Sequence, residues 1–306
     1  MKYHRMKIAI TEACNLNCVH CYMSKKSAKK MEVEIALNLL REACELGVEV
    51  VDLTGGEPSL HSHFLTITKF ALSMGFKQLN ISTNGFGLNL DDLHNFCDTN
   101  IHYFISMDGV SKRVVKMIRG RDIDELLELF QKLKQLKLKF SLRYSINAHN
   151  WNEISEMILF AQKLGVGVAF EPTQIVGNAG EDMVLSREQA LFVKQAIVNS
   201  CTSDILIEES FTAPFPCDGG QSDLLSIDLN GIGTTCLMIG VNKSNVAADT
   251  SLREMWDTLQ VYKERMKKFR PTLAGCNTCA HYLICLSGCL VTAYTKQCFN
   301  PWKEEY

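Results

Sequence analysis

Three cysteines fall within eight residues near the start of the chain: Cys14, Cys18 and Cys21, with the spacing C-x3-C-x2-C. They directly follow a short apolar segment, residues 6–10, that is typical of a β-strand. Three thiolates this close together can bind three irons of a cubane iron–sulfur cluster, whereas such clusters normally take four cysteine ligands. The next cysteine, Cys44, lies well inside a predicted helix. The spacing therefore predicts a cubane in which one iron is open to a ligand from outside the protein.

A zinc knuckle, or a set of buried free thiols, would also place cysteines close together. Structural zinc sites use four ligands, commonly as pairs of cysteines two residues apart. A lone C-x2-C pair would fit zinc well, but here a third cysteine is present and the aromatic-type His20 directly precedes Cys21. The longer run is more specific, and it favours iron–sulfur ligation.

Composition narrows the class of protein. The 306 residues are 46% hydrophobic and carry a formal net charge of -2, which suits one large domain, or one plus a smaller one, and gives no electrostatic reason to bind nucleic acid. No apolar run is long enough to predict a membrane span, and the first residues lack a signal-peptide pattern. Thirteen cysteines, clustered and without an export signal, favour metal binding in a reducing compartment over disulfides. We expect a cytoplasmic metalloprotein with no nucleic-acid or membrane partner.

Strand-like and helix-like segments alternate from residue 6 to about residue 200. Strands are predicted at 7–11, 48–54, 77–82, 102–107, 140–146 and 166–171, and helices at 32–46, 62–74, 90–99, 122–136, 152–164 and 186–199. The helices carry apolar residues at i, i+3 and i+4, and several strands are nearly all apolar, as buried parallel strands are. About six βα units predict an α/β fold with a parallel sheet, either open and doubly wound or a barrel, including an incomplete one. In either fold, functional residues belong at the carboxyl ends of the strands.

Polar and glycine-rich residues do follow the predicted strands. Beyond the cysteine loop they are Gly55, Gly56 and Glu57 after the second strand, Ser82 and Asn84 at the third, Ser106 and Asp108 at the fourth, and Arg143 on the fifth. Paired glycines let a backbone approach a ligand closely, and a glutamate can accept hydrogen bonds from an ammonium group. Each residue alone would be an ordinary turn or strand residue. Because all of them fall on one rim of the sheet, we expect them to line one cofactor site.

The alternation of strands and helices stops near residue 200. Asn230-Gly231 between two apolar segments, 224–229 and 232–237, predicts a β-hairpin, and a helix is predicted at 251–269. Seven cysteines lie in this part: Cys217, Cys236, Cys276, Cys279, Cys285, Cys289 and Cys298. Seven ligands exceed one zinc site and are one short of two four-cysteine sites. We therefore expect two domains, 1–200 and 201–306, the second small and rich in cysteine.

The cysteine run, together with Gly55-Gly56-Glu57-Pro58 after the second strand, resembles the radical S-adenosylmethionine (SAM) enzymes. The resemblance implies a partial (β/α)6 TIM-like barrel, in which the amino and carboxyl groups of SAM chelate the open iron. It implies that the glycine-rich element and Glu57 bind the SAM amino group and that Ser82 and Asn84 contact the ribose. Arg143 would meet the SAM carboxylate, although it could equally pair with Glu57 or Asp108. His20 would pack near the adenine.

The cysteines of the second part resemble the SPASM extension of radical SAM enzymes, which carries two auxiliary 4Fe–4S clusters. Together with the SAM-binding cluster, this implies three 4Fe–4S clusters. Ser287-Gly288-Cys289 stands where many members have Gly-Gly-Cys. The resemblance assigns Cys276, Cys279, Cys285 and Cys298 to the outer cluster and Cys217, Cys236 and Cys289 to the inner one.

Three further cysteines have other assignments. Cys44 and Cys97 lie on apolar faces of predicted helices, where we expect buried thiols. Cys201 has three open interpretations: the fourth ligand of the inner cluster, a thiol hydrogen donor beside the substrate, or a core residue.

The resemblance also implies a reaction. The reduced cluster cleaves SAM to methionine and a 5′-deoxyadenosyl radical, which abstracts a hydrogen atom from the substrate. SPASM-type enzymes most often modify peptides, so the first hypothesis is a maturase that cross-links a ribosomally made peptide through a thioether or carbon–carbon bond, or epimerises it. The alternative is an oxidase or epimerase of a small molecule such as a sugar or alcohol. A non-enzymatic iron–sulfur or zinc scaffold would not explain the residues at the strand ends.

The partners follow from this hypothesis. We expect a peptide substrate and an electron donor of the flavodoxin or ferredoxin type. Many such maturases carry a peptide-recognition domain before the barrel, and the position of Cys14 leaves no space for one. We therefore expect either a separate leader-recognition protein or recognition by the barrel itself.

Overall fold

The computed structural model describes residues 4–200, 207–208, 224–238 and 250–268. Within these residues the protein forms one nine-stranded sheet with the order β7-β6-β5-β4-β3-β2-β1-β8-β9. All neighbouring pairs are parallel except β8 and β9. The strands are β1 (Arg5–Thr11), β2 (Val50–Gly55), β3 (Gln78–Thr83), β4 (Ile101–Ser106), β5 (Lys139–Ile146), β6 (Val168–Pro172), β7 (Ile207–Glu208), β8 (Leu224–Ile227) and β9 (Gly233–Thr234).

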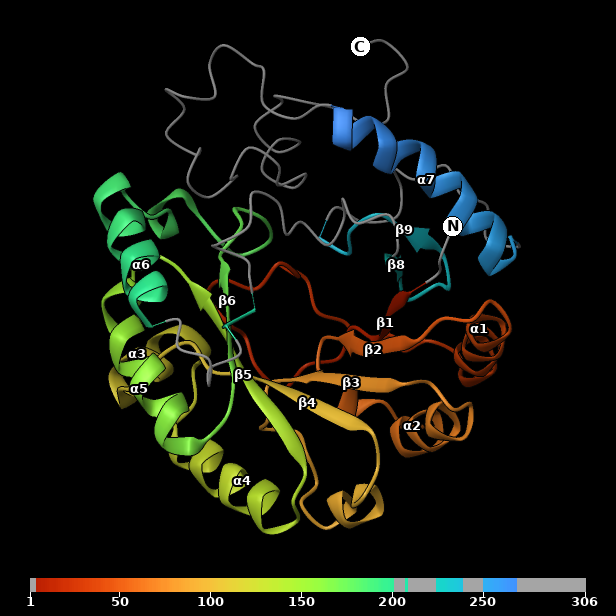
Figure 1. Ribbon diagram of the computed structural model, residues 1–306, viewed down its shortest axis with the longest axis horizontal. Coiled ribbons are helices and arrows are strands. Elements are labelled where there is room, and N and C mark those ends of the chain that lie inside the picture. The colour runs from red at the N-terminus through yellow and green to blue at the C-terminus, as the bar shows by residue number, and fades with distance from the viewer. Residues whose placement is uncertain (1–3, 201–206, 209–223, 239–249, 269–306) are drawn as a thin grey trace.

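The sheet curves into an arc, and helices cover its convex side (Figure 1). Each helix turns an apolar stripe toward the strands: α4, for example, buries Leu126, Leu129, Phe130 and Leu133, which share one helical face. The helices are α1 (Val33–Glu45), α2 (Phe64–Ser73), α3 (Lys112–Arg119), α4 (Asp124–Gln135), α5 (Ile154–Leu164), α6 (Arg187–Ser200) and α7 (Leu252–Lys268), and the 3-10 helices are η1 (Pro58–Leu60), η2 (Asp92–Phe96), η3 (Trp151–Glu153) and η4 (Glu181–Met183). The predicted partial barrel of βα units is confirmed.

One local prediction was wrong, and one helix was missed. The helix expected at 90–99 is only the 3-10 helix η2, because the Asn89 side chain accepts from the Asp91 N–H and so competes with helical hydrogen bonding. The helix α3 was not predicted. Its start is capped by Ser111, whose hydroxyl accepts from the Val114 N–H, and it ends at Gly120, which has φ +75. Both caps are visible in the sequence and could have revealed it.

The sheet continues past the predicted domain boundary near residue 200. β8 pairs in parallel with β1, with Arg5 opposite Leu224, and β9 completes the predicted hairpin, with Ser226 opposite Thr234. Gly231 supplies the positive φ (+79) that the hairpin turn requires. The division into two domains therefore stays a prediction, and it does not coincide with an edge of this sheet.

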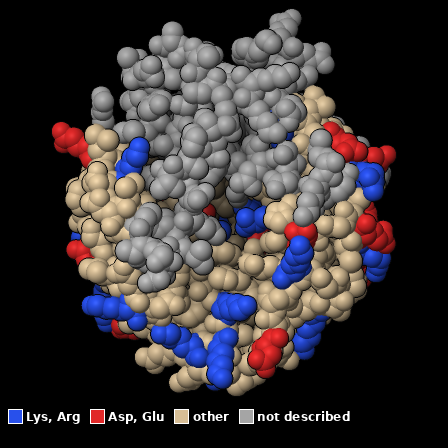
Figure 2. All heavy atoms as spheres, viewed as in Figure 1, with Lys and Arg blue, Asp and Glu red and all other residues tan. Residues whose placement is uncertain are grey.

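Several predicted residues lie outside the described part of the chain: Cys201, Cys217, Cys276, Cys279, Cys285, Cys289 and Cys298. Among the helices that are described, none has the length and apolarity needed to cross a membrane. Basic and acidic side chains are interspersed on the face seen in Figure 2, in keeping with the net charge of -2.

Candidate cofactor site at the carboxyl ends of the strands

The cysteine loop after β1 is held against the loop after β2 by backbone contacts. The N–H of Gly56 donates to the Thr11 carbonyl at 2.7 Å, and the N–H of Glu57 donates to the Ala13 carbonyl at 2.7 Å. A Cβ atom on Gly55 would lie 2.3 Å from the Thr11 oxygen, and one on Gly56 would lie 2.3 Å from the Ala13 oxygen. We expected the paired glycines to make room for a ligand. In the structure, the space left by the missing Cβ atoms of the two glycines is occupied by the backbone of the cysteine loop.

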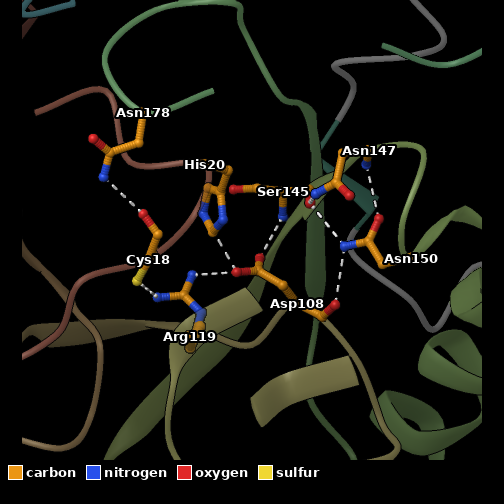
Figure 3. Close-up of polar contacts among 8 residues, drawn as sticks. All are labelled: Cys18, His20, Asp108, Arg119, Ser145, Asn147, Asn150 and Asn178. Atoms are coloured by element: carbon orange, nitrogen blue, oxygen red, sulfur yellow. Dashed lines mark hydrogen bonds and ion pairs between the residues drawn. The ribbon is translucent and has the colours of Figure 1, made fainter. Parts of the chain in front are cut away.

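The other side of the cysteine loop is held by Asn178, between β6 and α6. Its backbone N–H donates to the Cys21 carbonyl at 2.8 Å, and its Nδ2 donates to the Cys18 carbonyl at 3.1 Å (Figure 3). Gly177, just before it, has φ +69, and a Cβ there would lie 2.4 Å from the Cys21 oxygen. The sequence analysis missed this contact, although the run Gly177-Asn178-Ala179-Gly180 after the sixth strand was a visible signal.

All three thiols of the loop are free, and two of them receive side-chain donors. Asn84 Nδ2 lies 3.7 Å from Cys14 Sγ, and Arg119 Nη1 lies 3.8 Å from Cys18 Sγ. Burial raises the pKa of Cys18, and the Arg119 guanidinium opposes that rise. Donors aimed at sulfur favour the thiolate form that binds iron, so the donor set fits a cluster. In the described residues no three His, Cys, Asp or Glu side chains converge on one ion; cubane ligands need not converge, because each binds a different iron.

Asp108, just after β4, is the centre of a buried polar network (Figure 3). Its carboxylate forms an ion pair with Arg119 Nη2 at 2.7 Å and accepts from the Ser145 N–H at 2.8 Å. His20 Nε2 lies 3.4 Å away, and burial lowers the pKa of this histidine. Asn150 Nδ2 donates to the Asp108 carbonyl. The carboxylate thus faces protein groups, and the cofactor contacts expected of Asp108 and His20 stay predictions.

Arg119 was not among the predicted site residues. It is the last residue of α3, a position where a basic side chain usually faces solvent and the helix dipole favours it. One partner, Asp108, lies in the segment between β4 and α3, and the other, Cys18, lies in the loop after β1. No local signal in the sequence distinguishes it from a surface arginine.

Glu57 is fully buried between the loops after β2 and β3. Its Oε1 accepts from the hydroxyls of Ser59 (2.8 Å) and Thr83 (2.7 Å), and its Oε2 accepts from the Asn84 N–H at 2.7 Å. Burial raises the pKa of this carboxyl, while the donors oppose the rise. Glu57 therefore ties the two loops together. The predicted contact with the SAM amino group would add to these bonds.

Arg143 on β5 contacts residues of three other strands, β3, β4 and β6. Its Nη1 donates to the Ser82 hydroxyl at 3.3 Å, and its Nε lies 3.3 Å from Glu171 Oε1. The guanidinium carbon lies 4.9 Å from the centre of the Phe104 ring. Of the carboxylates considered from the sequence, neither Glu57 nor Asp108 is the partner seen here. Ser106 is half-buried and lies opposite Arg143 in the β4–β5 register.

The remaining described cysteines differ in their surroundings. Cys236 is half-buried. Burial raises the pKa of Tyr22, and the electrostatic effects of Cys21, Cys236 and Cys14 raise it further. Cys44 is exposed, so the prediction of a buried thiol was wrong. It sits beside the buried stripe of α1, and its Sγ–H donates to the Met74 carbonyl at 3.3 Å.

The described structure is thus a half-barrel of parallel strands with a three-cysteine loop after the first strand and polar groups at the strand ends. Residues 8–161, about half of the chain, match the family model described as "Radical SAM superfamily". The chain belongs to the radical SAM superfamily. It accordingly binds SAM and the iron–sulfur cluster of that family.

Two relatives among known proteins differ in how much of the chain they cover. A probable GTP 3′,8-cyclase of Saccharolobus solfataricus is 30% identical over 166 residues, covering 53% of this chain and 54% of that protein. The mycofactocin maturase MftC of Mycobacterium tuberculosis is 24% identical over 312 residues, covering 93% of this chain and 78% of that protein. The alignment with the cyclases therefore spans only about half of their length.

Solved structures resemble nearly the whole chain. Streptococcus suis SuiB bound to the precursor peptide SuiA aligns with a TM-score of 0.76 and 16% identity, covering 98% of this chain and 74% of SuiB. The protein anSMEcpe with bound AdoMet and Cp18Cys peptide aligns with a TM-score of 0.73 and 14% identity, covering 98% of this chain and 91% of that one. At these identities the likeness shows the fold.

Proposed function

We propose that this protein is a radical SAM enzyme that modifies a ribosomally synthesised peptide. The observation that carries the proposal is the extent of the likeness. MftC, a maturase, aligns with 93% of the chain, and SuiB, solved with a precursor peptide, aligns with 98%. The cyclase relative aligns with 53%. The alignments with peptide-modifying proteins therefore include the part of the chain that follows the barrel. We expect this part to select the substrate and to accept the electron that leaves it.

The protein's own residues have defined tasks in this proposal. Cys14, Cys18 and Cys21 bind the cluster, and Asn178 fixes the carbonyls of the last two. When bound, the cluster and SAM supply a 5′-deoxyadenosyl radical that abstracts a hydrogen atom from the substrate. Arg143 orients the SAM carboxylate, which would require it to share its guanidinium with Glu171.

The other predicted SAM contacts form part of the same proposal. They lie at the ends of β2, β3 and β4 or in the cysteine loop, on one rim of the sheet. They are His20, Gly55, Gly56, Glu57, Ser82, Asn84, Ser106 and Asp108.

The type of modification depends on how the substrate is returned to a closed-shell product. In an oxidative cross-link, the substrate loses two hydrogens and a second electron leaves through auxiliary clusters. In an epimerisation, a thiol returns a hydrogen atom, and Cys201 is the first candidate. We propose three 4Fe–4S clusters, and the second domain, 201–306, as the holder of two.

A mass measurement tests the peptide proposal. The reconstituted enzyme is incubated without oxygen in deuterated water with SAM, a flavodoxin- or ferredoxin-type donor and the short peptide encoded beside its gene. Loss of two hydrogens indicates cross-linking or desaturation, and gain of one carbon-bound deuterium indicates epimerisation. Cys18→Ala is the control, because it removes a cluster ligand. An unchanged peptide, while SAM is cleaved, contradicts the proposal and favours a small molecule such as a sugar or alcohol.

Two further measurements separate the alternatives. Replacing the peptide by GTP tests the activity named for the cyclase relative, and a cyclised nucleotide would contradict peptide maturation. Iron analysis tests the clusters: three cubanes require about twelve irons per chain, and about four would remove the auxiliary pair. If the peptide reacts only after a separate leader-recognition protein is added, the barrel by itself is not sufficient to recognise the leader.

A further inference from the structure

Arg119 places a positive charge beside one cluster ligand. The residue is only 6% exposed, and its guanidinium points from the end of α3 toward the cysteine loop (Figure 3). Nη2 pairs with Asp108 Oδ2 at 2.7 Å and Nη1 donates to Cys18 Sγ at 3.8 Å. Its Nε is buried without a hydrogen-bond partner among the described residues. The side chain is therefore aimed at the sulfur and the carboxylate rather than at water.

Burial of this ion pair has an energetic cost that a surface arginine would avoid. Desolvation of two charges can exceed their mutual attraction, so a buried pair is weak evidence for a role in stability. Arg121, two residues further on, shows the surface alternative. It pairs with Glu125 at 2.6 Å with both side chains well exposed. The inward position of Arg119 calls for a role at the cysteine loop.

The charge acts on Cys18 in particular. Arg119 Nη1 donates to the Cys18 sulfur at 3.8 Å, whereas the Asp108 carboxylate is bound to the other terminal nitrogen, Nη2, so the positive group is the one in contact with this sulfur. Cys14, by contrast, receives the neutral amide of Asn84. Asp108 is itself fixed by the Ser145 N–H. The carboxylate therefore orients the guanidinium without cancelling its effect on the sulfur.

We propose that Arg119 is a positioning residue for the cluster, which fixes the Cys18 thiolate and raises the reduction potential of the cluster by a fixed positive charge. Reduction adds one negative charge to the cluster, and a nearby cation stabilises that state more than the oxidised one. Cluster potentials respond to net charge and to hydrogen bonds on the sulfurs. The proposal rests on membership of the radical SAM superfamily and is independent of whether the substrate is a peptide.

The test is a redox titration followed by electron paramagnetic resonance, with the full-length protein and no peptide. The signal to follow is the one that changes when SAM is added, because it belongs to the SAM-binding cluster. Arg119→Gln removes the charge and keeps a donor, whereas Arg119→Lys keeps the charge. The pair Arg119→Gln with Asp108→Asn removes both charges, so no buried carboxylate is left unpaired. Arg121→Gln is the matched surface control.

We expect Arg119→Gln to lower the midpoint potential of the cluster. At the wild-type midpoint, the ratio of reduced to oxidised cluster should fall about tenfold, which corresponds to a shift of about 59 mV for one electron. Arg119→Lys and Arg121→Gln should stay near the wild-type midpoint. An unshifted midpoint in Arg119→Gln, or an equal shift in Arg119→Lys, would overturn the proposal. The proposal would also be overturned if both Arg119→Gln and the double variant lost iron while Arg121→Gln retained it. Arg119 would then be needed to fold the cysteine loop, and not to set the potential of the cluster. The absence of peptide separates this outcome from failure of the maturase proposal.

Discussion

Asn84 and Cys14 are joined by an N–H···S contact across 3.7 Å, although their strands, β3 and β1, are not neighbours in the sheet. Asn84 Nδ2 also donates to Asn15 Oδ1 at 2.8 Å, and its Oδ1 accepts from the Phe86 N–H. The side chain predicted to contact the SAM ribose is therefore engaged with the cysteine loop. Any ribose contact would have to be made alongside these bonds.

Asn84→Asp should weaken cluster binding. The substitution keeps the shape of the side chain but replaces the donor by a carboxylate facing Cys14, a loss of about 1–3 kcal/mol. Iron transfer to a chelator, measured without oxygen, should be faster than in the wild type. Asn95→Asp, at an exposed position of η2, is the control and should release iron at the wild-type rate. Equal rates in both variants would contradict the role of the Asn84 amide.

Gly56→Ala should prevent the loops after β1 and β2 from packing. A Cβ at this position would lie 2.3 Å from the Ala13 oxygen, and backbone cannot yield as a flexible side chain can. We expect a cost at the upper end of the roughly 1–3 kcal/mol that overpacking a site entails, together with loss of bound iron. Gly75→Ala is the control. It meets no atom within 4 Å and suffers only the strain of its positive φ. A variant Gly56→Ala that holds a full cluster would contradict this prediction.

Glu57→Gln should lower the free energy of unfolding by about 1–3 kcal/mol, because the amide cannot accept from every donor around it. The amide oxygen can face the Asn84 N–H, and the Ser59 and Thr83 hydroxyls can rotate to accept from the NH2 group. The Ser59 N–H, which donates to Oε1 at 3.3 Å, would then face the NH2 group and lose its acceptor. Urea unfolding of the reduced protein measures the change. The exposed Glu45→Gln serves as the matched control, and comparable stability of the two variants would show that Glu57 does not tie the loops.

His61 should make the protein less stable as the pH falls. The His63 N–H donates to its Nδ1 at 3.0 Å, and its Nε2 lies 2.8 Å from the Met31 oxygen, so the neutral ring with its proton on Nε2 fits. Burial lowers the pKa of His61. The stability it contributes is therefore present above the ordinary histidine value of about 6.5 and is lost as the pH falls below it.

The pH prediction can be checked by urea unfolding at pH 7.5 and pH 5.5. The loss of stability between these values should be smaller in His61→Gln than in the wild type. Some loss should remain, because burial also lowers the pKa of His102. The exposed His94→Gln should keep the full wild-type loss. If His61→Gln loses as much stability as the wild type between pH 7.5 and pH 5.5, protonation of His61 does not account for the pH dependence.

The parts of the fold that were predicted correctly rest on local chemistry. Apolar periodicity located the strands and most helices, and Asn230-Gly231 located the hairpin, since each signal lies within a few residues. The helix expected at 90–99 was wrong because the asparagine and aspartate side chains of that segment bind their own backbone. The spacing of apolar residues carries no information about such side-chain to backbone hydrogen bonds.

The candidate site was predictable in its location but not in its contacts. Placing the cysteine loop after β1 and the glycine-rich loop after β2 at the carboxyl ends of the strands needed only the parallel topology. The inward turn of Arg119 depends on Asp108 and Cys18, and the use of Gly56 depends on Ala13. The contacts of Arg119 with Cys18 and of Gly56 with Ala13 join residues far apart in the chain, so no pattern within one segment predicts them.

Asn178 gives the cysteine loop a second consequence. It belongs to the loop after β6, which the sheet order separates from β1 by four strands, yet it holds the carbonyls of Cys18 and Cys21. Among the described residues, the loop that carries the proposed iron ligands therefore also connects the carboxyl ends of the first and sixth strands. If oxygen removes the iron from these cysteines, we expect the connection between those strands to weaken as well. We expect proteases to cut oxidised molecules faster in the cysteine loop and in the loop after β6. Damage to the cofactor would then lead to removal of the damaged protein, because Asn178 joins the two loops through the carbonyls of Cys18 and Cys21.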